Sequence, residues 1–533
     1  MAKKINFFSS KNRRKLIDKI SSNYFDIVVI GGGITGAGIC LDAISRGLNV
    51  CLIEMNDFAS GTSSKSTKLI HGGLRYLEQL KLKLVNETGR ERAVLHNIAP
   101  HLVKSEKMLL PISINGKLNK FFTYLALFVY DYLAGVKNND KKKMLSKKKT
   151  LTMEPLLNEN KIKGGALYSE YRTDDSRLTI EILMKAYNLG ALPINYIKAK
   201  SFIYDNDRIV GLNCNDQLGN KTLKIKSKTV INASGSWTDD IIKNKNKKLI
   251  LSKGIHIVLP IEKFPINQSV YFDAMDGRMI FSIPRDKTVY IGTTDTLFDK
   301  EKDKLRVLKK EVKYLIDSVN NIFSVRLELN DVISSWVGLR PLIRQDKKNV
   351  SEISRKDEVF ISKDGLITIA GGKLTGYRKM AERVVNILVK KFKFSSPNSK
   401  TKNLKLFDFN YDECSNKVKN LGISSEDFTM LYNVYGDKSI RIFKIYNKIK
   451  NRHKNYSLLI AEIIYCIENE MCHNLLDFFS QRNAMIYFDI DKVKKSLEMI
   501  KKSYIEIKNL SDNHWEKELK NIKKYIFEIT NFI

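Results

Sequence analysis

Three glycines near the N-terminus have a spacing that suits the binding of a dinucleotide. They are Gly31, Gly33 and Gly36, in the run GGGITG. In such a turn Gly31 permits the tight bend, Gly33 lets a pyrophosphate approach the backbone, and Gly36 lets a helix pack closely. Glu54 follows Gly31 by 23 residues, where a carboxylate accepts hydrogen bonds from an adenosine ribose. The pattern predicts a dinucleotide site.

The segments around these residues are expected to form a strand, a helix and a second strand. Residues 24–30 are an apolar run rich in β-branched side chains that leads into the glycine turn. Apolar residues at helical spacing follow in 37–48, and 50–53 form a second β-rich run. This βαβ unit places the free N–H groups of a helix N-terminus opposite the phosphates.

The next segment favours FAD over NAD as the dinucleotide. The unit lies near the N-terminus and is followed by residues 59–68, ASGTSSKSTK, which are dense in hydroxyl groups and small side chains. These groups suit a second set of phosphate and ribityl contacts, although an ordinary polar loop would have a similar composition.

The run from Lys68 to Glu78, KLIHGGLRYLE, resembles the signature of the FAD-dependent glycerol-3-phosphate dehydrogenases, within the D-amino-acid-oxidase-like flavoproteins. Further motifs of that family follow in order between residues 24 and 380. They are YRTDDSRL (171–178), VINASGSW (230–237), SKGIH (252–256), GRMIFSIP (277–284), IGTTD (291–295), VGLRPL (337–342) and GGKLTGYR (371–378). Beyond residue 380 the resemblance becomes weaker.

The resemblance implies an α/β and α+β fold. We expect a basic N-terminal arm in 1–22 and a Rossmann-like FAD-binding domain in 23–105, 160–250 and 335–395. An antiparallel substrate-binding domain is expected in 106–159 and 251–334, because alternating strands are predicted at 268–274, 279–283 and 289–292. A C-terminal all-helical domain is expected in 396–533, and the lysine-rich stretch 137–149 is expected to be an exposed loop.

The glycine turns and the resemblance together give the expected contacts of FAD, which we expect to be bound non-covalently. His71 is interpreted as structural, and covalent flavin attachment through it is the alternative. The expected cofactor-binding residues are Gly31, Gly33, Gly36, Glu54, Thr62, Ser63, Ser64, Lys68, His71, Ala233, Gly235, Gly372, Lys373, Leu374 and Thr375.

The resemblance also supplies the reaction, the oxidation of sn-glycerol 3-phosphate to dihydroxyacetone phosphate by hydride transfer to flavin N5. We expect His256 to act as base or proton relay, because a neutral imidazole accepts a proton near neutral pH. Arg340 is expected to orient and stabilise the developing alkoxide, since a guanidinium is not deprotonated in proteins. The expected substrate-binding residues are Arg75, Tyr76, Arg355 and Lys373, and no metal site is predicted.

The net charge of +34 attracts anionic partners, but its scattered lysines are also typical of a solvated basic surface. The longest apolar stretch, 121–130, is too short to span a bilayer, and the lysines beside it suit an interfacial helix. A core helix is the alternative. The six cysteines lack the spacing of a metal site or a disulfide framework, which indicates a cytosolic protein. We therefore expect a cytoplasmic protein associated peripherally with the inner face of the cell membrane.

Three functions are compatible with these features. The first is a dehydrogenase that passes electrons to a membrane quinone, and the second is a glycerol-3-phosphate oxidase that reduces oxygen to hydrogen peroxide. The family's oxidases tend to carry an additional insertion, which is not obvious here. The third is an RNA-binding flavoprotein that uses the basic surface. We expect the dehydrogenase, with no nucleic-acid partner; the sequence leaves the oligomeric state open, with a homodimer as one option.

Overall fold

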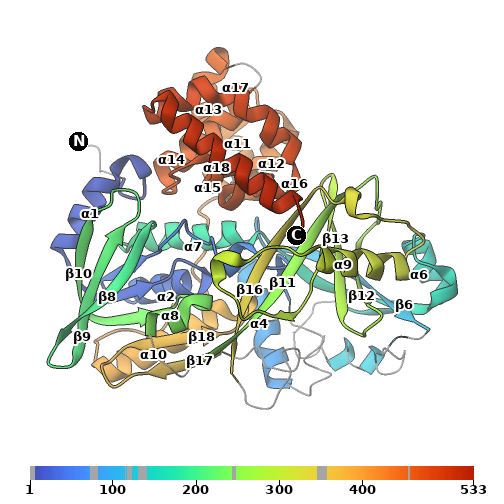
Figure 1. The fold of residues 1–533 in the computed structure, drawn as a ribbon, viewed down its shortest axis with the longest axis horizontal. Helices are drawn as coiled ribbons and strands as arrows, with labels where there is room; N and C mark the ends of the chain where they lie inside the picture. Colours follow the sequence, from blue (N-terminus) through green and yellow to red (C-terminus); the bar gives the residue numbers. More distant parts are fainter. Residues whose placement is uncertain are drawn as a thin grey trace.

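Two sheets and a helical domain make up the protein in a computed structural model (Figure 1). The structure describes residues 6–71, 82–114, 116, 123–125, 127–129, 141–242, 248–344, 357–453 and 456–533. The helical domain lies on top of the two sheets, and its helices carry the last colours of the chain. This arrangement confirms the predicted fold class.

The smaller sheet carries the glycine turn. Within the described residues it has eight strands, with a mainly parallel centre. In spatial order they are β17 (Asp357–Ile361), β18 (Ile367–Gly371), β10 (Thr222–Asn232), β1 (Tyr24–Ile30), β2 (Val50–Ile53) and β7 (Leu192–Ile194), with β9 (Arg208–Asp216) paired to β10 and β8 (Ile197–Asp205) paired to β9. The predicted strands 24–30 and 50–53 match β1 and β2, which are almost wholly buried because both faces of this sheet are covered.

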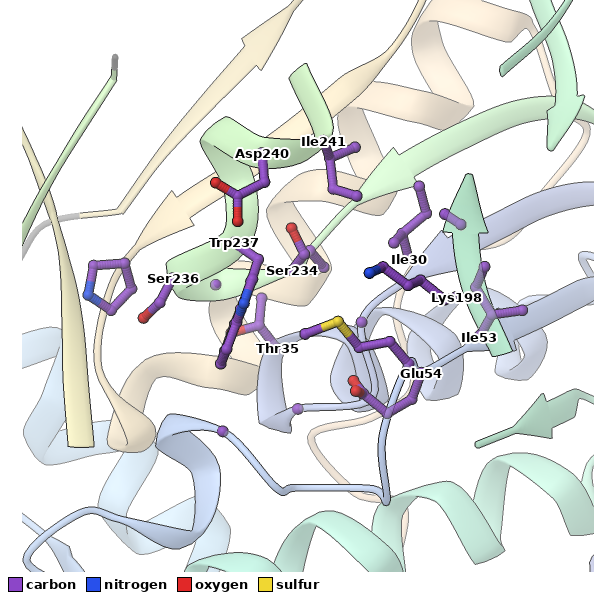
Figure 2. Close-up of a pocket in the computed structure, with 18 of the residues that line it drawn as sticks. Ile30, Thr35, Ile53, Glu54, Lys198, Ser234, Ser236, Trp237, Asp240 and Ile241 are labelled. Atoms are coloured by element: carbon purple, nitrogen blue, oxygen red, sulfur yellow. The ribbon is translucent and has the colours of Figure 1, made fainter. Parts of the chain in front are cut away.

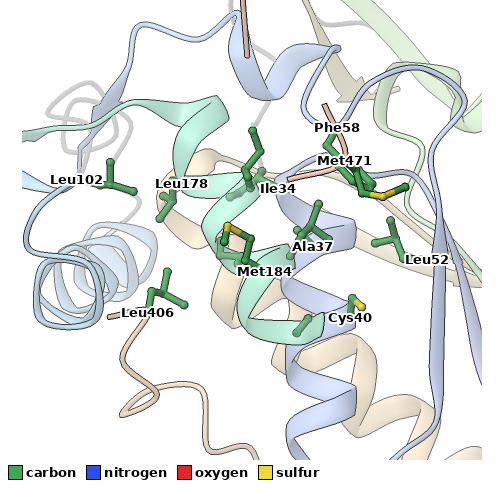
Figure 3. Close-up of a cluster of buried hydrophobic side chains, with 14 of the residues drawn as sticks. Ile34, Ala37, Cys40, Leu52, Phe58, Leu102, Leu178, Met184, Leu406 and Met471 are labelled. Atoms are coloured by element: carbon green, nitrogen blue, oxygen red, sulfur yellow. The ribbon is translucent and has the colours of Figure 1, made fainter. Parts of the chain in front are cut away.

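Helices cover the smaller sheet and complete its core. They are α2 (Ile34–Ser45), α7 (Asp175–Asn188) and α10 (Tyr377–Phe392), while α8 (Thr238–Ile242) follows β10. Ile34, Ala37 and Cys40 of α2 belong to one buried cluster with Leu178 and Met184 of α7 (Figure 3). The small side chains of α2 allow this close contact between the helices.

The larger sheet has ten strands within the described part of the chain. In order they are β15 (Thr296–Leu297), β11 (Leu249–Pro260), β14 (Thr288–Gly292), β13 (Met279–Arg285), β12 (Ser269–Asp273), β4 (Lys104–Ser113), β6 (Ile162–Arg172) and β3 (Leu69–Ile70), with β16 (Ser334–Ile343) on β11 and β5 (Lys143–Leu145) on β6. Helix α9 (Lys309–Ile322) contributes Val312, Leu315 and Val319 to the core on one face, and α4 (Leu82–Ile98) contributes to the other core.

Sheet membership differs from the predicted segment boundaries at β6 and β16. Both fall in segments expected in the FAD-binding domain, yet β6 pairs with β4 and β16 pairs with β11 over ten residue pairs. Hydrogen bonding between strands far apart in sequence decides this membership, and a linear pattern does not encode it.

Two lysine-rich segments are more ordered than the sequence suggested. Residues 13–22 of the expected arm form α1 (Arg13–Ser22), in which Leu16 and Ile20 are buried and Arg13 forms an ion pair with Asp216 at 2.7 Å. The expected loop 137–149 contains β5 and the start of α6 (Lys147–Met153). That expectation was wrong for residues 143–149, because β5 pairs with β6 and the side chain of Thr150 is buried on it.

The regular structure of the C-terminal domain is helical within its described residues, and its first helix begins at Tyr411. Its helices are α11 (Tyr411–Val418), α12 (Ser425–Tyr435), α13 (Ser439–His453), α14 (Ser457–Asn469), α15 (Leu475–Asp477), α16 (Met485–Phe488), α17 (Ile490–Lys508) and α18 (Asp512–Thr530). Between α15 and α16, residues Phe478–Arg482 form a π-helical turn. Figure 1 shows α15, α16 and α18 on the side of the domain that faces the two sheets.

Candidate active site

The glycine turn connects β1 to α2 as predicted. Gly31 has φ of +114°, and a Cβ there would lie 2.5 Å from the carbonyl oxygen of Ala233. A Cβ at Gly36 would overlap with the carbonyl oxygen of Gly31. Both positions therefore require glycine for close backbone packing, and the turn leaves the N-terminus of α2 facing the cavity described below.

Glu54 stands at the end of β2 beside this turn. Its carboxylate accepts hydrogen bonds from the backbone N–H of Gly32 at 2.7 Å and of Asn56 at 2.9 Å. Burial raises the pKa of Glu54, and these two N–H donors act in the opposite direction. The carboxylate is thus fixed at the position where a ribose is expected.

The hydroxyl-rich segment 59–68 folds back onto the turn. Ser63 Oγ accepts from the N–H of Ile34 at 2.9 Å, and Thr62 donates to the carbonyl of Leu339 at 2.6 Å. Ser66 donates through its hydroxyl to Asp175 at 2.6 Å. The segment therefore links the first residue of α2, strand β16 and the first residue of α7.

A cavity of about 1190 Å³ runs between these segments. The side chains of Glu54, Lys198 and Trp237 come from separate parts of the chain and point toward the same space (Figure 2). Of the expected cofactor-binding residues, those that line it are Gly31, Gly33, Glu54, Thr62, Ser63, Ala233, Gly235, Gly372, Lys373 and Leu374. The structure thus brings together residues that are more than 340 positions apart in the sequence.

The other expected cofactor-binding residues, Gly36, Ser64, Lys68, His71 and Thr375, are not part of the cavity lining. Gly36 packs α2 onto the turn, and the ammonium group of Lys68 is buried in an ion pair with Asp175 at 2.5 Å. The hydroxyl of Thr375 is hydrogen-bonded to both the N–H and the carbonyl of His71. Ser64 is buried, and its hydroxyl donates to the carbonyl of Gly61. These contacts tie the residues to segments that line the cavity or lie beside it.

Three expected substrate-binding residues, Arg75, Tyr76 and Arg355, lie outside the described residues.

Several residues of the cavity were not predicted from the sequence. Asp175 belongs to one of the recognised motifs and lines the cavity, so that motif was a usable signal for it. Lys198, Tyr204 and Leu212 also line it, from the antiparallel strands β8 and β9. No local pattern in the sequence marks these three, because the hairpin reaches the cavity only through its pairing with β10.

His256 is buried on β11 and does not line the cavity. Its Nε2 lies 2.9 Å from the hydroxyl of Thr67, and its ring stacks on Trp336 with centroids 4.8 Å apart. A Cβ at Gly292 would overlap with the imidazole, so the ring occupies space that this glycine leaves open. Burial, together with the positive charges of Arg340 and Lys68, lowers the pKa of His256 well below 6.5. The ring is therefore neutral at pH 7.

Arg340 lies on β16, directly across from Ser252 of β11. Its guanidinium donates to the carbonyl of Thr294 at 3.0 Å and to the hydroxyl of Thr293 at 2.8 Å, and it pairs with Asp295 at 3.2 Å. A Cβ at Gly254 would collide with the guanidinium. The side chain is thus held in one orientation by three neighbours from a single loop.

The described residues fit a bound FAD. A helix N-terminus and a fixed carboxylate suit the phosphates and the ribose at one end of the cavity. At the other end Gly371 and Gly372 have φ of +76° and +88°. These two glycines and the positively charged Lys373 line the cavity there. That arrangement suits the anionic edge of a reduced flavin.

Comparison with known proteins agrees with this fit. Residues 26–378 match the family model described as "FAD dependent oxidoreductase", and residues 373–513 match "C-terminal domain of alpha-glycerophosphate oxidase". The chain is 42% identical over 98% of its length to the "Aerobic glycerol-3-phosphate dehydrogenase" of Staphylococcus haemolyticus, with 98% of that protein covered. The corresponding protein of Staphylococcus saprophyticus is 45% identical over 92% of each chain.

A solved structure matches along the full length. The glycerol-3-phosphate dehydrogenase from Bacillus halodurans complexed with FAD superposes with a TM-score of 0.83 at 38% identity, covering 98% of this chain and 99% of that one. The predicted resemblance is therefore confirmed. The chain belongs to the aerobic glycerol-3-phosphate dehydrogenase family of FAD dependent oxidoreductases.

Proposed function

We propose that the protein oxidises sn-glycerol 3-phosphate to dihydroxyacetone phosphate and passes the electrons to a membrane quinone. The observation that carries the proposal is the full-length similarity to proteins named aerobic glycerol-3-phosphate dehydrogenase, together with a cavity whose lining fits FAD. When bound, FAD supplies the acceptor for the hydride at flavin N5.

In this proposal Arg340 stabilises the negative charge that develops on the substrate oxygen. Its orientation is already fixed by Thr293, Thr294 and Asp295, so little reorganisation is needed during the reaction. His256 is the proton acceptor or relay. Its ring is neutral at pH 7 because burial lowers its pKa, and the hydroxyl of Thr67 is within hydrogen-bonding distance of Nε2.

The phosphate of the substrate requires fixed cations. We propose Arg75, Arg355 and Lys373 for this role, with Tyr76 as an uncharged substrate contact; of these residues Lys373 lines the cavity next to Gly372. A guanidinium binds phosphate oxygens in a bidentate manner, which favours the two arginines as the principal contacts.

An anaerobic reduction experiment tests the substrate and the acceptor separately. The purified FAD-containing protein is mixed with sn-glycerol 3-phosphate without oxygen, and the flavin absorbance is followed until it bleaches. A quinone or air is then added. Rapid reoxidation by quinone and slow reoxidation by air is the expected result. A flavin that stays oxidised after substrate addition would overturn the proposed substrate.

A glycerol-3-phosphate oxidase is the second candidate, since the C-terminal residues match a domain model named after alpha-glycerophosphate oxidase. The same experiment distinguishes the two, because rapid reoxidation by air with formation of hydrogen peroxide would identify the oxidase.

We also propose that the protein docks on the anionic inner face of the cell membrane. Each helix in the described part of the chain is too short or too polar to span a bilayer. The expected apolar stretch 121–130 is described only in part, and there Tyr124, Leu125 and Phe128 have exposed fractions of 48%, 46% and 52%. Lys142 lies over the rings of Tyr124 and Phe128, which gives the exposed apolar surface a positive border. A homodimer is also proposed, and light scattering of the purified protein tests it.

A further inference from the structure

A buried ion pair joins the C-terminal domain to the segment that follows Glu54. We call residues 54–60 the cofactor loop, because Glu54, Met55, Asn56 and Ser60 line the FAD cavity. Asp57 is not part of the cavity lining, and its carboxylate contacts Arg482. The guanidinium donates to both carboxylate oxygens, at 2.5 Å and 3.0 Å, and the side chains of Arg482 and Asp57 are 0% and 3% exposed.

The cofactor loop is wrapped around the glycine turn. Glu54 accepts from the N–H of Gly32, and the N–H of Ala59 donates to the carbonyl of Gly32 at 3.1 Å. The ring of Phe58 lies so close to Gly32 that a Cβ there would be 2.7 Å from it. In the sequence Asp57 lies between Glu54 and Phe58, which both contact Gly32. A shift of Asp57 would therefore move both of these residues.

The C-terminal domain also contacts helix α7, whose first residue lines the cavity, through residues next to Arg482. Arg482 also donates to the backbone carbonyl of Glu470 at 2.8 Å. The carboxylate of Glu470 accepts two hydrogen bonds from Arg177 of α7, each of 2.7 Å. At the N-terminal end of α7, Asp175 lines the cavity and binds Ser66.

Two further contacts join the C-terminal domain to segments near the cavity. Lys65 of the hydroxyl-rich segment donates to Tyr487 and, at 2.9 Å, to Tyr525, both from the C-terminal domain. Phe58 and Met471 belong to one buried hydrophobic cluster (Figure 3). The helical domain therefore contacts three segments that shape the FAD cavity, and none of its described residues belongs to the cavity lining.

Energetics favour a positioning role over a purely stabilising one. A buried ion pair adds little net stability, since removing both charges from water offsets most of their attraction. Its geometry is nevertheless strict, because a bidentate guanidinium and carboxylate fit in one plane only. Arg482 thus fixes where Asp57 lies more effectively than it stabilises the fold.

We propose that Arg482 is a positioning residue for the cofactor loop. Acting through Asp57, it holds Glu54 and the glycine turn in the conformation that receives FAD, so that docking of the C-terminal domain and affinity for FAD are linked. The inference rests on the FAD site alone and is independent of the proposed substrate and acceptor.

The test measures the dissociation constant for FAD by flavin fluorescence, well below the unfolding temperature. Asp57→Asn keeps the shape of the side chain and removes the charge, and the double variant Asp57→Asn with Arg482→Gln leaves neither charge unpaired. We expect the dissociation constant to rise about tenfold to a hundredfold in both variants. The absorption spectrum of the bound flavin should also change, which a general loss of stability would not produce.

Glu311→Gln is the matched control, because Glu311 forms a similarly buried ion pair with Lys253 at 2.7 Å in the larger sheet region. This control is expected to lower the unfolding temperature without weakening FAD binding. The inference would be overturned if the double variant bound FAD as tightly as the wild type. It would also be overturned if Glu311→Gln weakened FAD binding to the same extent as Asp57→Asn. Reduction by sn-glycerol 3-phosphate is not needed for either measurement.

Discussion

At the scale of single residues, Arg340 and His256 differ in how the protein controls their charge. Arg340 stays charged and is oriented by Thr293, Thr294 and Asp295. His256 is buried beside Trp336, and burial is the main reason that its pKa lies well below 6.5. One side chain thus carries a positive charge in a fixed orientation, and the other is a neutral imidazole at pH 7.

Replacement of Arg340 should separate chemistry from cofactor binding. If Arg340 has the proposed role, Arg340→Ala is expected to slow flavin reduction by sn-glycerol 3-phosphate by about two to four orders of magnitude, because a preorganised donor to the reacting oxygen would be lost. FAD content should remain, since Arg340 does not line the cavity. Stopped-flow measurement of flavin bleaching gives the rate, and a rate close to that of the wild type would remove the proposed role.

A second histidine should make stability depend on pH. His101 is buried, and burial is the main cause that lowers its pKa from 6.5 to about 3, with Lys438 and Arg177 acting in the same direction. Below pH 6.5 the unfolded chain binds a proton at His101 that the folded protein does not bind. The free energy of unfolding should therefore decrease as the pH is lowered from about 6 to about 3, by up to about 1.4 kcal/mol for each pH unit.

Urea unfolding of the wild type and of His101→Phe over this range measures the effect. The variant should lose this part of the pH dependence, whereas His514→Phe, which replaces an exposed ring on α18, should follow the wild type. Identical slopes for the wild type and His101→Phe would contradict the prediction.

At the scale of elements, the contact between β1, its turn and α2 is the most restrictive feature of the site. Gly36→Ala should destabilise the protein by roughly 1–3 kcal/mol, because the added methyl group would overlap with the carbonyl oxygen of Gly31. FAD binding should weaken with it, as the turn must shift. Gly376→Ala is the control, since nothing lies within 4 Å of a Cβ at that position. Equal unfolding free energies for the two variants would show that the turn tolerates a side chain.

At the scale of the whole molecule, the net charge of +34 and the exposed residues around Tyr124 should act together on a membrane. Sedimentation with vesicles that contain phosphatidylglycerol should show strong binding at low salt and much weaker binding at about 0.5 M salt, because the Debye length becomes short. The variant Tyr124→Ser with Phe128→Ser should bind less at both salt concentrations. Tyr24→Ser, which removes another exposed aromatic ring, should bind as the wild type does. Unchanged binding of the double variant would exclude this surface as the docking site.

The sequence by itself determined the glycine turn, its flanking strands and the family. Strands β1 and β2 were predicted to the residue, and β12, β13 and β14 to within two residues at each end, because burial on one or both faces produces local patterns. Gly31, Gly33 and Glu54 were found because a phosphate-binding turn needs these residue types within one short segment.

Only the tertiary structure decided which distant segments form the cavity and what supports it. Lys198 reaches the cavity through the pairing of β8, β9 and β10, and Lys68 is buried in an ion pair with the cavity residue Asp175. The bond between Asp57 and Arg482 spans 425 positions. Such contacts depend on how separate elements pack, and no local pattern in the sequence identifies the partner of each residue.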